Sequence, residues 1–201
     1  YIIDMVGDEV DEVDTSSPGI FTIYYQATSQ DKVTYKTSRL VMVYDPTLTA
    51  SIEGDWAVDY TQSQRIDGNY DWTWAEWSAY YTSDAWTYSA YSLTKYNLTF
   101  TEIVPGIYEV NDLLGGFYTA LRGYGPLMAE EEGDEYYNYY SMGGMVLLNA
   151  DLSLNLISSS IPAWGDGLDD LTGTYDDTNE VLDIHSIYGG GMDFHVVMNK
   201  K

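Results

Sequence analysis

The sequence contains no cysteine and only two histidines among its 201 residues. Without cysteine, the chain forms no disulfide and offers no thiolate as a nucleophile or as a ligand for zinc or iron–sulfur clusters. The two histidines, His185 and His195, fall on neighbouring expected strands without a third ligand, so we interpret them as structural residues. No phosphate loop, dinucleotide fingerprint or nucleophile elbow is present. We therefore expect no metal, no cofactor and no catalytic residues, and a protein that is not an enzyme.

Basic residues are scarce as well. Eight lysine and arginine residues stand against 32 acidic residues, which gives a formal net charge of −24 at pH 7. Such a chain repels phosphate backbones and anionic membrane surfaces, so we expect no nucleic-acid partner. Long apolar runs are also missing, because no stretch of about 18 apolar residues could span a bilayer as a helix.

The first ten residues lack the basic and apolar segments of a signal peptide. The chain also opens without methionine, inside an expected strand. We therefore expect that upstream sequence is missing, and that any signal peptide and anchor are absent from this chain.

The chain is rich in β-forming and aromatic residues, among them 21 tyrosines and 6 tryptophans. Two regions, 1–46 and 47–201, meet where an Asp-Pro step ends an apolar run. In the first region, residues 19–27 and 38–44 alternate apolar and polar side chains with the period of a strand. Residues 29–32 between them predict a hairpin turn.

The second region is predicted to consist of short antiparallel strands separated by turns rich in Gly, Asn and Asp. The expected strands are 52–60, 93–104, 106–110, 116–121, 145–149, 152–158, 171–175, 181–186 and 192–198. A short stretch at 75–81 is the one helical candidate. Eight or nine such strands predict an all-β fold, either a closed antiparallel β-barrel or a β-sandwich.

One motif favours the barrel. The Gly-Asp-Trp tripeptide at 54–56 is similar to the Gly-x-Trp signature of lipocalin-like barrels. Segments 171–176, 181–184 and 194–198 resemble the closing strands of such barrels. This resemblance implies that Trp56 plugs the closed end beneath a cavity. It also leaves open a carrier that holds a small apolar ligand in an apolar cavity.

Residues 13–28 and 39–45 resemble the second half of the bacterial immunoglobulin-like (Ig-like) domains related to hyalin repeats. The shared pattern is an Asp-Thr pair, a Pro-Gly turn, an alternating aromatic strand and a final Arg-x-Val-x-Val-x-Asp strand. Phe21 and Ile23 replace the usual tyrosine and valine and keep the apolar face. The resemblance implies that residues 1–46 are the C-terminal part of an Ig-like sandwich, a module that mostly serves as a spacer.

Nearly the full chain resembles an uncharacterised family of Bacteroidetes surface lipoproteins, in which an Ig-like domain precedes a C-terminal β domain. The resemblance rests on the segment 105–118, the Asn-Ala-Asp at 149–151 and the Trp-Gly-Asp at 164–166. Such proteins are typically encoded beside SusC/SusD-type glycan-uptake systems. The resemblance therefore implies an outer-membrane lipoprotein at the cell surface, with an outer-membrane transporter as a partner.

Aromatic side chains supply the candidate ligand site. They are concentrated at Trp72, Trp74, Trp77, Trp86 and Tyr88. Sugars present flat C–H faces that stack on aromatic rings and hydroxyls that bond to carboxylates, so aromatic platforms beside acids suit a glycan. The alternative is that these rings form the core or cover one end of the barrel.

A second candidate lies in a glycine-flanked loop, where Trp164 could project and Asp166 could bond a hydroxyl. Its alternative is a buried tryptophan that anchors the loop. Together the two candidates predict a glycan-binding surface protein without enzymatic activity, with a polysaccharide or oligosaccharide as ligand. The rival hypotheses are a structural module that docks to an outer-membrane complex and the small-molecule carrier.

Overall fold

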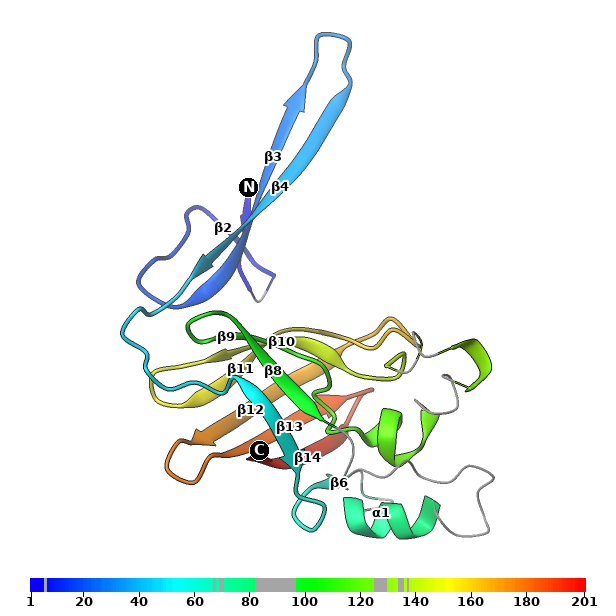
Figure 1. The fold of residues 1–201 in the computed structure, drawn as a ribbon. Helices are drawn as coiled ribbons and strands as arrows, with labels where there is room; N and C mark the ends of the chain where they lie inside the picture. Colours follow the sequence, from blue (N-terminus) through cyan, green and yellow to red (C-terminus); the bar gives the residue numbers. More distant parts are fainter. Residues whose placement is uncertain are drawn as a thin grey trace.

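The computed structural model describes residues 1–5, 7–66, 68, 71–81, 97–124, 130–133, 136 and 138–201. Its strands form two separate sheets, one of four strands and one closed into a barrel (Figure 1). The expected all-β fold is therefore confirmed. Among the described residues, no helix has the length and apolar character needed to cross a membrane.

The N-terminal sheet has the strand order β2-β1-β3-β4. Its strands are β1 (Ile2–Ile3), β2 (Glu9–Val10), β3 (Gly19–Thr28) and β4 (Thr34–Val43). The two long strands form the expected hairpin, which extends away from the rest of the molecule in Figure 1. Its turn closes through a hydrogen bond from the Lys32 amide to the Ser29 carbonyl, 3.0 Å long, with Lys32 at a φ of 62°.

The barrel is a ring of eight antiparallel strands. They are β5 (Gly54–Val58), β8 (Leu98–Val104), β9 (Ile107–Val110), β10 (Gly143–Leu148), β11 (Ser153–Ser160), β12 (Leu168–Asp176), β13 (Val181–Tyr188) and β14 (Met192–Lys200). Pairing of β13 with β14 closes the ring, which decides in favour of the barrel over the sandwich. Two short strands, β6 (Gln64–Ile66) and β7 (Trp72–Thr73), extend the sheet beside β14 and lead into the helix α1 (Trp74–Tyr81).

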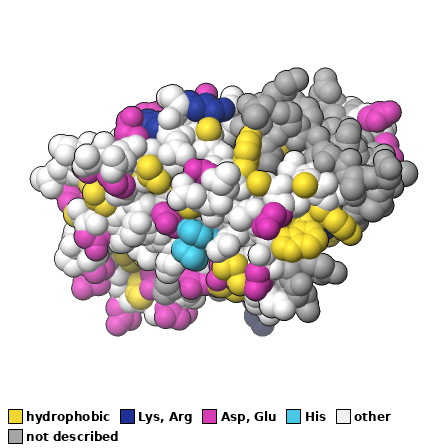
Figure 2. Space-filling view, turned by 90° about the horizontal axis from the view of Figure 1, so that it is seen from below, with side chains coloured by type: hydrophobic (Ala, Val, Ile, Leu, Met, Phe, Trp, Pro, Cys, Tyr) yellow, Lys and Arg dark blue, Asp and Glu magenta, His cyan; other side chains and the backbone are white. Residues whose placement is uncertain are grey.

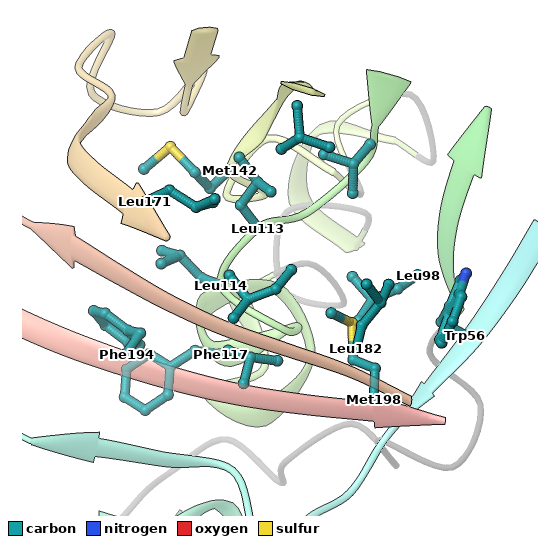
Figure 3. Packing of buried hydrophobic residues seen from close by; sticks show 14 of the residues in the cluster. Trp56, Leu98, Leu113, Leu114, Phe117, Met142, Leu171, Leu182, Phe194 and Met198 are labelled. Atoms are coloured by element: carbon teal, nitrogen blue, oxygen red, sulfur yellow. The ribbon is translucent and has the colours of Figure 1, made fainter. Parts of the chain in front are cut away.

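Alternation along the strands fills the interior of the barrel with apolar side chains. In β14, Phe194, Val196 and Met198 are buried, whereas His195 is partly exposed and Asn199 is exposed. Figure 3 shows such side chains from several strands packed against one another across the interior. Trp56 in the middle of β5 is fully buried, and its indole Nε1 donates a 2.9 Å hydrogen bond to the Ile52 carbonyl.

The prediction of one strand, at 116–121, is wrong. Residues 116–121 form a π-helical turn, η2 (Phe117–Leu121), rather than a strand. The two glycines before it cause the difference, because Gly115 and Gly116 have φ values of 62° and 77°. Two successive residues in the left-handed region end an extended chain. At Gly115 the missing side chain also lets the backbone approach β14, since a Cβ there would lie 2.7 Å from Val196 Cγ1.

The N-terminal sheet touches the outside of the barrel. Ile20 of β3 packs with Ile107 of β9 and Leu147 of β10 in a small apolar cluster. The connecting segment also contacts the barrel, and the Leu48 side chain lies against Gly106. The β3–β4 hairpin is therefore attached at its base, near the barrel end at which β9 begins.

Candidate functional site

Aromatic side chains gather at the other end of the barrel, where β10 and β12 begin and β11 ends. We call this set the aromatic cluster, and its members are Tyr118, Tyr124, Tyr139, Tyr140 and Trp164. They come from η2 and the residues just after it, from the turn before β10 and from the loop between β11 and β12. Segments that are distant in sequence thus form one continuous group of rings.

Trp164 is the exposed member of the cluster, with 48% of its surface accessible. Its ring makes T-shaped contacts with the rings of Tyr118 and Tyr140, whose centroids lie 5.1 Å and 5.4 Å away. The loop that carries it is held by hydrogen bonds from the Gly165 amide to the Ile161 carbonyl (2.8 Å) and from the Ile161 amide to the Asp166 carbonyl (2.8 Å). The indole is therefore held by two ring contacts while part of its surface faces solvent.

Asp166 lies two residues further along the same loop and is exposed. The Tyr188 hydroxyl at the end of β13 contacts both carboxylate oxygens, donating to Oδ1 at 3.1 Å with Oδ2 at 3.3 Å. Burial, together with this hydrogen bond to a carboxylate, raises the pKa of Tyr188 well above its ordinary value. Tyr188 thus remains a neutral donor and orients Asp166, whose other lone pairs are available to a ligand hydroxyl.

Arg122 contributes a positive charge to the cluster. Its guanidinium carbon lies 4.7 Å from the ring centroid of Tyr124 and 5.6 Å from that of Tyr118. Contacts at this distance are attractive, because the ring face is electron-rich. Burial raises the pKa of Tyr118 despite the nearby arginines, so this tyrosine is neutral at physiological pH. The tyrosine faces are therefore ordered by the arginine before any ligand arrives.

A buried carboxylate positions η2 beneath the cluster. Asp112 accepts hydrogen bonds from the amides of Leu114 (3.0 Å), Gly116 (3.1 Å) and Met142 (3.2 Å). These bonds join the start of η2 to the segment that leads into β10. Tyr118 and Tyr140, which lie on these two segments, are thereby held at a fixed separation.

The structure places the tryptophans of 72–77 differently from the expected ligand platform. Trp74 and Trp77 are buried, and Trp74 Nε1 donates to the Gly115 carbonyl at 3.1 Å. Trp72 is half-buried, with its ring centroid 4.8 Å from that of Trp77. Trp74 and Trp77 pack against Phe117 and belong to the core of the barrel. We therefore correct the expectation of a ligand-facing surface for Trp74 and Trp77.

The remaining predicted residues divide into two groups. Trp164 and Asp166 lie together at the surface as expected, whereas Trp86 and Tyr88 lie outside the described residues. Sequence reasoning missed Tyr118 and Arg122, because the segment around them was predicted to be a strand. The tyrosine-rich sequence before residue 141 was the available signal for Tyr140.

A groove of about 590 Å³ lies on the outer face of the barrel. Its lining includes Thr99, Thr101, Asn111, Ser158 and Ser160. This groove differs from a lipocalin-like lumen, since its threonine and serine side chains project from the outside of β8 and β11. The barrel interior beside it is occupied by the packed core.

The fold and the site define a class of protein: an eight-stranded antiparallel barrel with an N-terminal β-sheet and an aromatic surface cluster. A family model described as a C-terminal domain matches residues 45–200, which is most of the chain. The chain therefore belongs to that C-terminal-domain family.

A solved structure supports the same fold. The crystal structure of the lipoprotein BT2262 from Bacteroides thetaiotaomicron aligns over 100% of this chain and 81% of that chain, with a TM-score of 0.51. The two sequences are 22% identical, so the likeness concerns the fold alone. No curated protein matches the sequence.

Proposed function

We propose that the protein binds glycans at the aromatic cluster and does no chemistry on them. The observation that carries this proposal is the exposed indole of Trp164, held by T-shaped contacts with Tyr118 and Tyr140. A ring held in this way stacks on the C–H face of a sugar without losing rotational freedom on binding. The adjacent Asp166 carboxylate supplies an acceptor for the sugar hydroxyls.

The ligand class follows from the chemistry of the cluster. Tyrosine hydroxyls, one carboxylate and an arginine surround an apolar ring, and a neutral, hydroxyl-rich ligand suits this mixture. A chain with a net charge of −24 disfavours polyanionic ligands, so we propose a neutral polysaccharide or oligosaccharide.

We extend the proposal to the cellular setting. The structural relative is described as a lipoprotein, and we propose that this protein is likewise a lipoprotein, anchored at the outer surface of the outer membrane. There it would hold glycan for an uptake system with an outer-membrane transporter as its partner. Protease accessibility on intact cells, compared with lysed cells, tests the surface location.

Isothermal titration calorimetry against a panel of neutral polysaccharides tests glycan binding. We expect at least one glycan to release heat and to shift the tryptophan fluorescence of the protein. Trp164→Ala removes the stacking surface and should reduce affinity by at least tenfold, a factor that corresponds to about 1.4 kcal/mol. Asp166→Asn should weaken binding less, because the amide still offers an acceptor oxygen.

Two matched variants control this experiment. Tyr35→Ala removes an exposed ring from the β3–β4 hairpin, and Asp177→Asn removes an exposed charge from the turn after β12. Both should bind glycan as the unchanged protein does. The proposal fails if no glycan in the panel binds, or if Trp164→Ala binds as tightly as Tyr35→Ala.

The exposed side chains of the N-terminal hairpin favour a second candidate function. Tyr25, Tyr35 and Leu40 all lie at the surface on β3 and β4. Exposed apolar side chains on an extended sheet are typical of protein contacts, so docking to an outer-membrane complex is the alternative. Co-purification of a transporter that Tyr35→Ala abolishes, together with calorimetry that detects no glycan, would favour this alternative.

A further inference from the structure

Both histidines of the chain lie side by side on the outer face of the β13–β14 hairpin. His185 and His195 are directly opposite each other in the strand register, and their rings stack with centroids 4.2 Å apart. Figure 2 shows histidine at the surface in the middle of this face, with acidic side chains around it. This location is independent of the aromatic cluster, since Tyr188 of the same strand points into the barrel.

A carboxylate lies within reach of both rings. Asp183 Oδ1 is 2.8 Å from His195 Nε2 and 3.8 Å from His185 Nε2. One ligand atom from each of Asp183, His185 and His195 can be chosen such that all three lie within 4.8 Å of one another. Tetrahedral zinc with bonds of about 2.0–2.1 Å needs ligand atoms roughly 3.3 Å apart. The observed separations bracket this value, so small side-chain rotations suffice.

A second carboxylate orients the more exposed ring. Asp193 Oδ1 lies 3.7 Å from His185 Nδ1 on the side away from Asp183. In the described part of the chain this oxygen is buried and accepts no hydrogen bond. A histidine that binds a metal through one ring nitrogen usually donates its other N–H to a carboxylate. Asp193 is placed to accept that proton, which leaves His185 Nε2 unprotonated toward Asp183.

We propose that Asp183, His185 and His195 bind a divalent transition-metal ion, with Zn²⁺ as the biological candidate and Asp193 as the positioning residue for His185. The ligands favour this class of ion, since imidazole suits zinc, copper and nickel whereas calcium and magnesium prefer all-oxygen sites. Three protein ligands leave one tetrahedral position open to water or to an external donor.

The hairpin makes the site rigid. β13 and β14 pair without a register shift from Val181 to Tyr188, and three glycines close the turn. Side chains on paired strands keep their relative positions better than side chains on loops. His195 is 19% exposed and hydrogen-bonded, whereas His185 is 48% exposed and can rotate toward the ion. We therefore expect binding to need little reorganisation.

Calorimetric titration of the untagged protein with zinc chloride, in a buffer without chelators, tests the site. The full chain should bind one zinc ion through this site, and His185→Gln and Asp183→Asn should each weaken that binding by at least tenfold. Asp193→Asn should weaken it to a smaller extent, because it removes the acceptor that orients His185. Asp177→Asn, which removes the same charge from an exposed turn, should bind zinc normally.

A second measurement needs no variant. Because the chain has only two histidines, ¹⁵N spectra of the histidine side chains report each ring separately. Zinc should shift a ring nitrogen of both residues, and calcium chloride should shift neither. The proposal is overturned if the ring signals do not move, if both variants bind zinc as the unchanged protein does, or if zinc binds only at millimolar concentration.

Discussion

The rings of Trp164 and Tyr118 form a T-shaped contact, with the two ring planes at 82°. Tyr118 is buried, whereas Trp164 is half exposed, so a ring of the core orients a ring at the surface. Edge-to-face contact of this kind pairs the positive rim of one ring with the negative face of the other. The contact thereby holds the surface indole in a fixed orientation on the barrel.

A double-mutant cycle measures this contact. We expect Trp164→Leu and Tyr118→Leu to show a coupling free energy of about 0.5–1.5 kcal/mol in urea unfolding, the range of aromatic pairs. The control pair, Trp164→Leu with Tyr35→Leu, combines a residue of a barrel loop with one on the N-terminal sheet and should be additive. Additivity in both pairs would contradict the assigned orientation of Trp164.

The two ends of the barrel should respond differently to loss of an indole. Trp56→Ala removes a fully buried ring and its hydrogen bond to Ile52, so the free energy of unfolding should fall by about 3–5 kcal/mol. Trp164→Ala removes an exposed ring and should cost about 1 kcal/mol or less. Chemical unfolding followed by circular dichroism gives both values. Equal losses would contradict the difference in burial between Trp56 and Trp164.

Adjacent glycines in β10 offer a matched test of packing. A Cβ on Gly144 would lie 2.3 Å from the Ser158 carbonyl oxygen, whereas a Cβ on Gly143 would meet nothing closer than 3.7 Å. Gly144→Ala should therefore destabilise the barrel by about 1–3 kcal/mol, as overpacking does. Gly143→Ala should be tolerated in the same thermal unfolding assay. A Gly144→Ala protein as stable as Gly143→Ala would contradict the close approach of β10 and β11.

Stability should fall in alkaline solution. Burial raises the pKa of Tyr118, Tyr140, Tyr175 and Tyr188 above the ordinary tyrosine value of 10.0. The unfolded chain then loses these protons at lower pH than the folded protein does, so deprotonation favours unfolding. The free energy of unfolding should be fully retained below about pH 9 and should decrease toward about pH 11.

Tyr188→Phe removes one of these groups and should make the alkaline decrease shallower. Urea titrations at a series of pH values provide the comparison with the unchanged protein. A free energy of unfolding that stays constant through this range would contradict the burial of the tyrosine hydroxyls.

The barrel was predictable because short β-forming segments follow one another along the chain and the turns between many of them contain glycine, asparagine or aspartate. The local predictions that were wrong concern features that depend on more than the local pattern of residue types. Tryptophans such as Trp74 and Trp77 are typical of sugar-binding surfaces. Here they are buried because α1 packs against Phe117. The segment 116–121 has strand-like residues, and the left-handed glycine pair before it overrides that preference.

The sequence contains a weak signal for the histidine cluster that our prediction did not use. An aspartate stands two residues before each histidine, at Asp183 and Asp193, and therefore on the same face of its strand. Whether the two faces meet depends on the register of the hairpin, which the sequence leaves open. The structure supplies that register by pairing His185 with His195.

The closing strand β14 pairs with β5, β6 and β13, and it follows every other strand of the ring along the chain. During synthesis, the first seven ring strands therefore leave the ribosome before the ring can seal. Until residues 192–200 emerge, β5 and β13 present unpaired edges, which are templates for association with other chains. A nascent or truncated form without β14 would depend on chaperones to remain unaggregated.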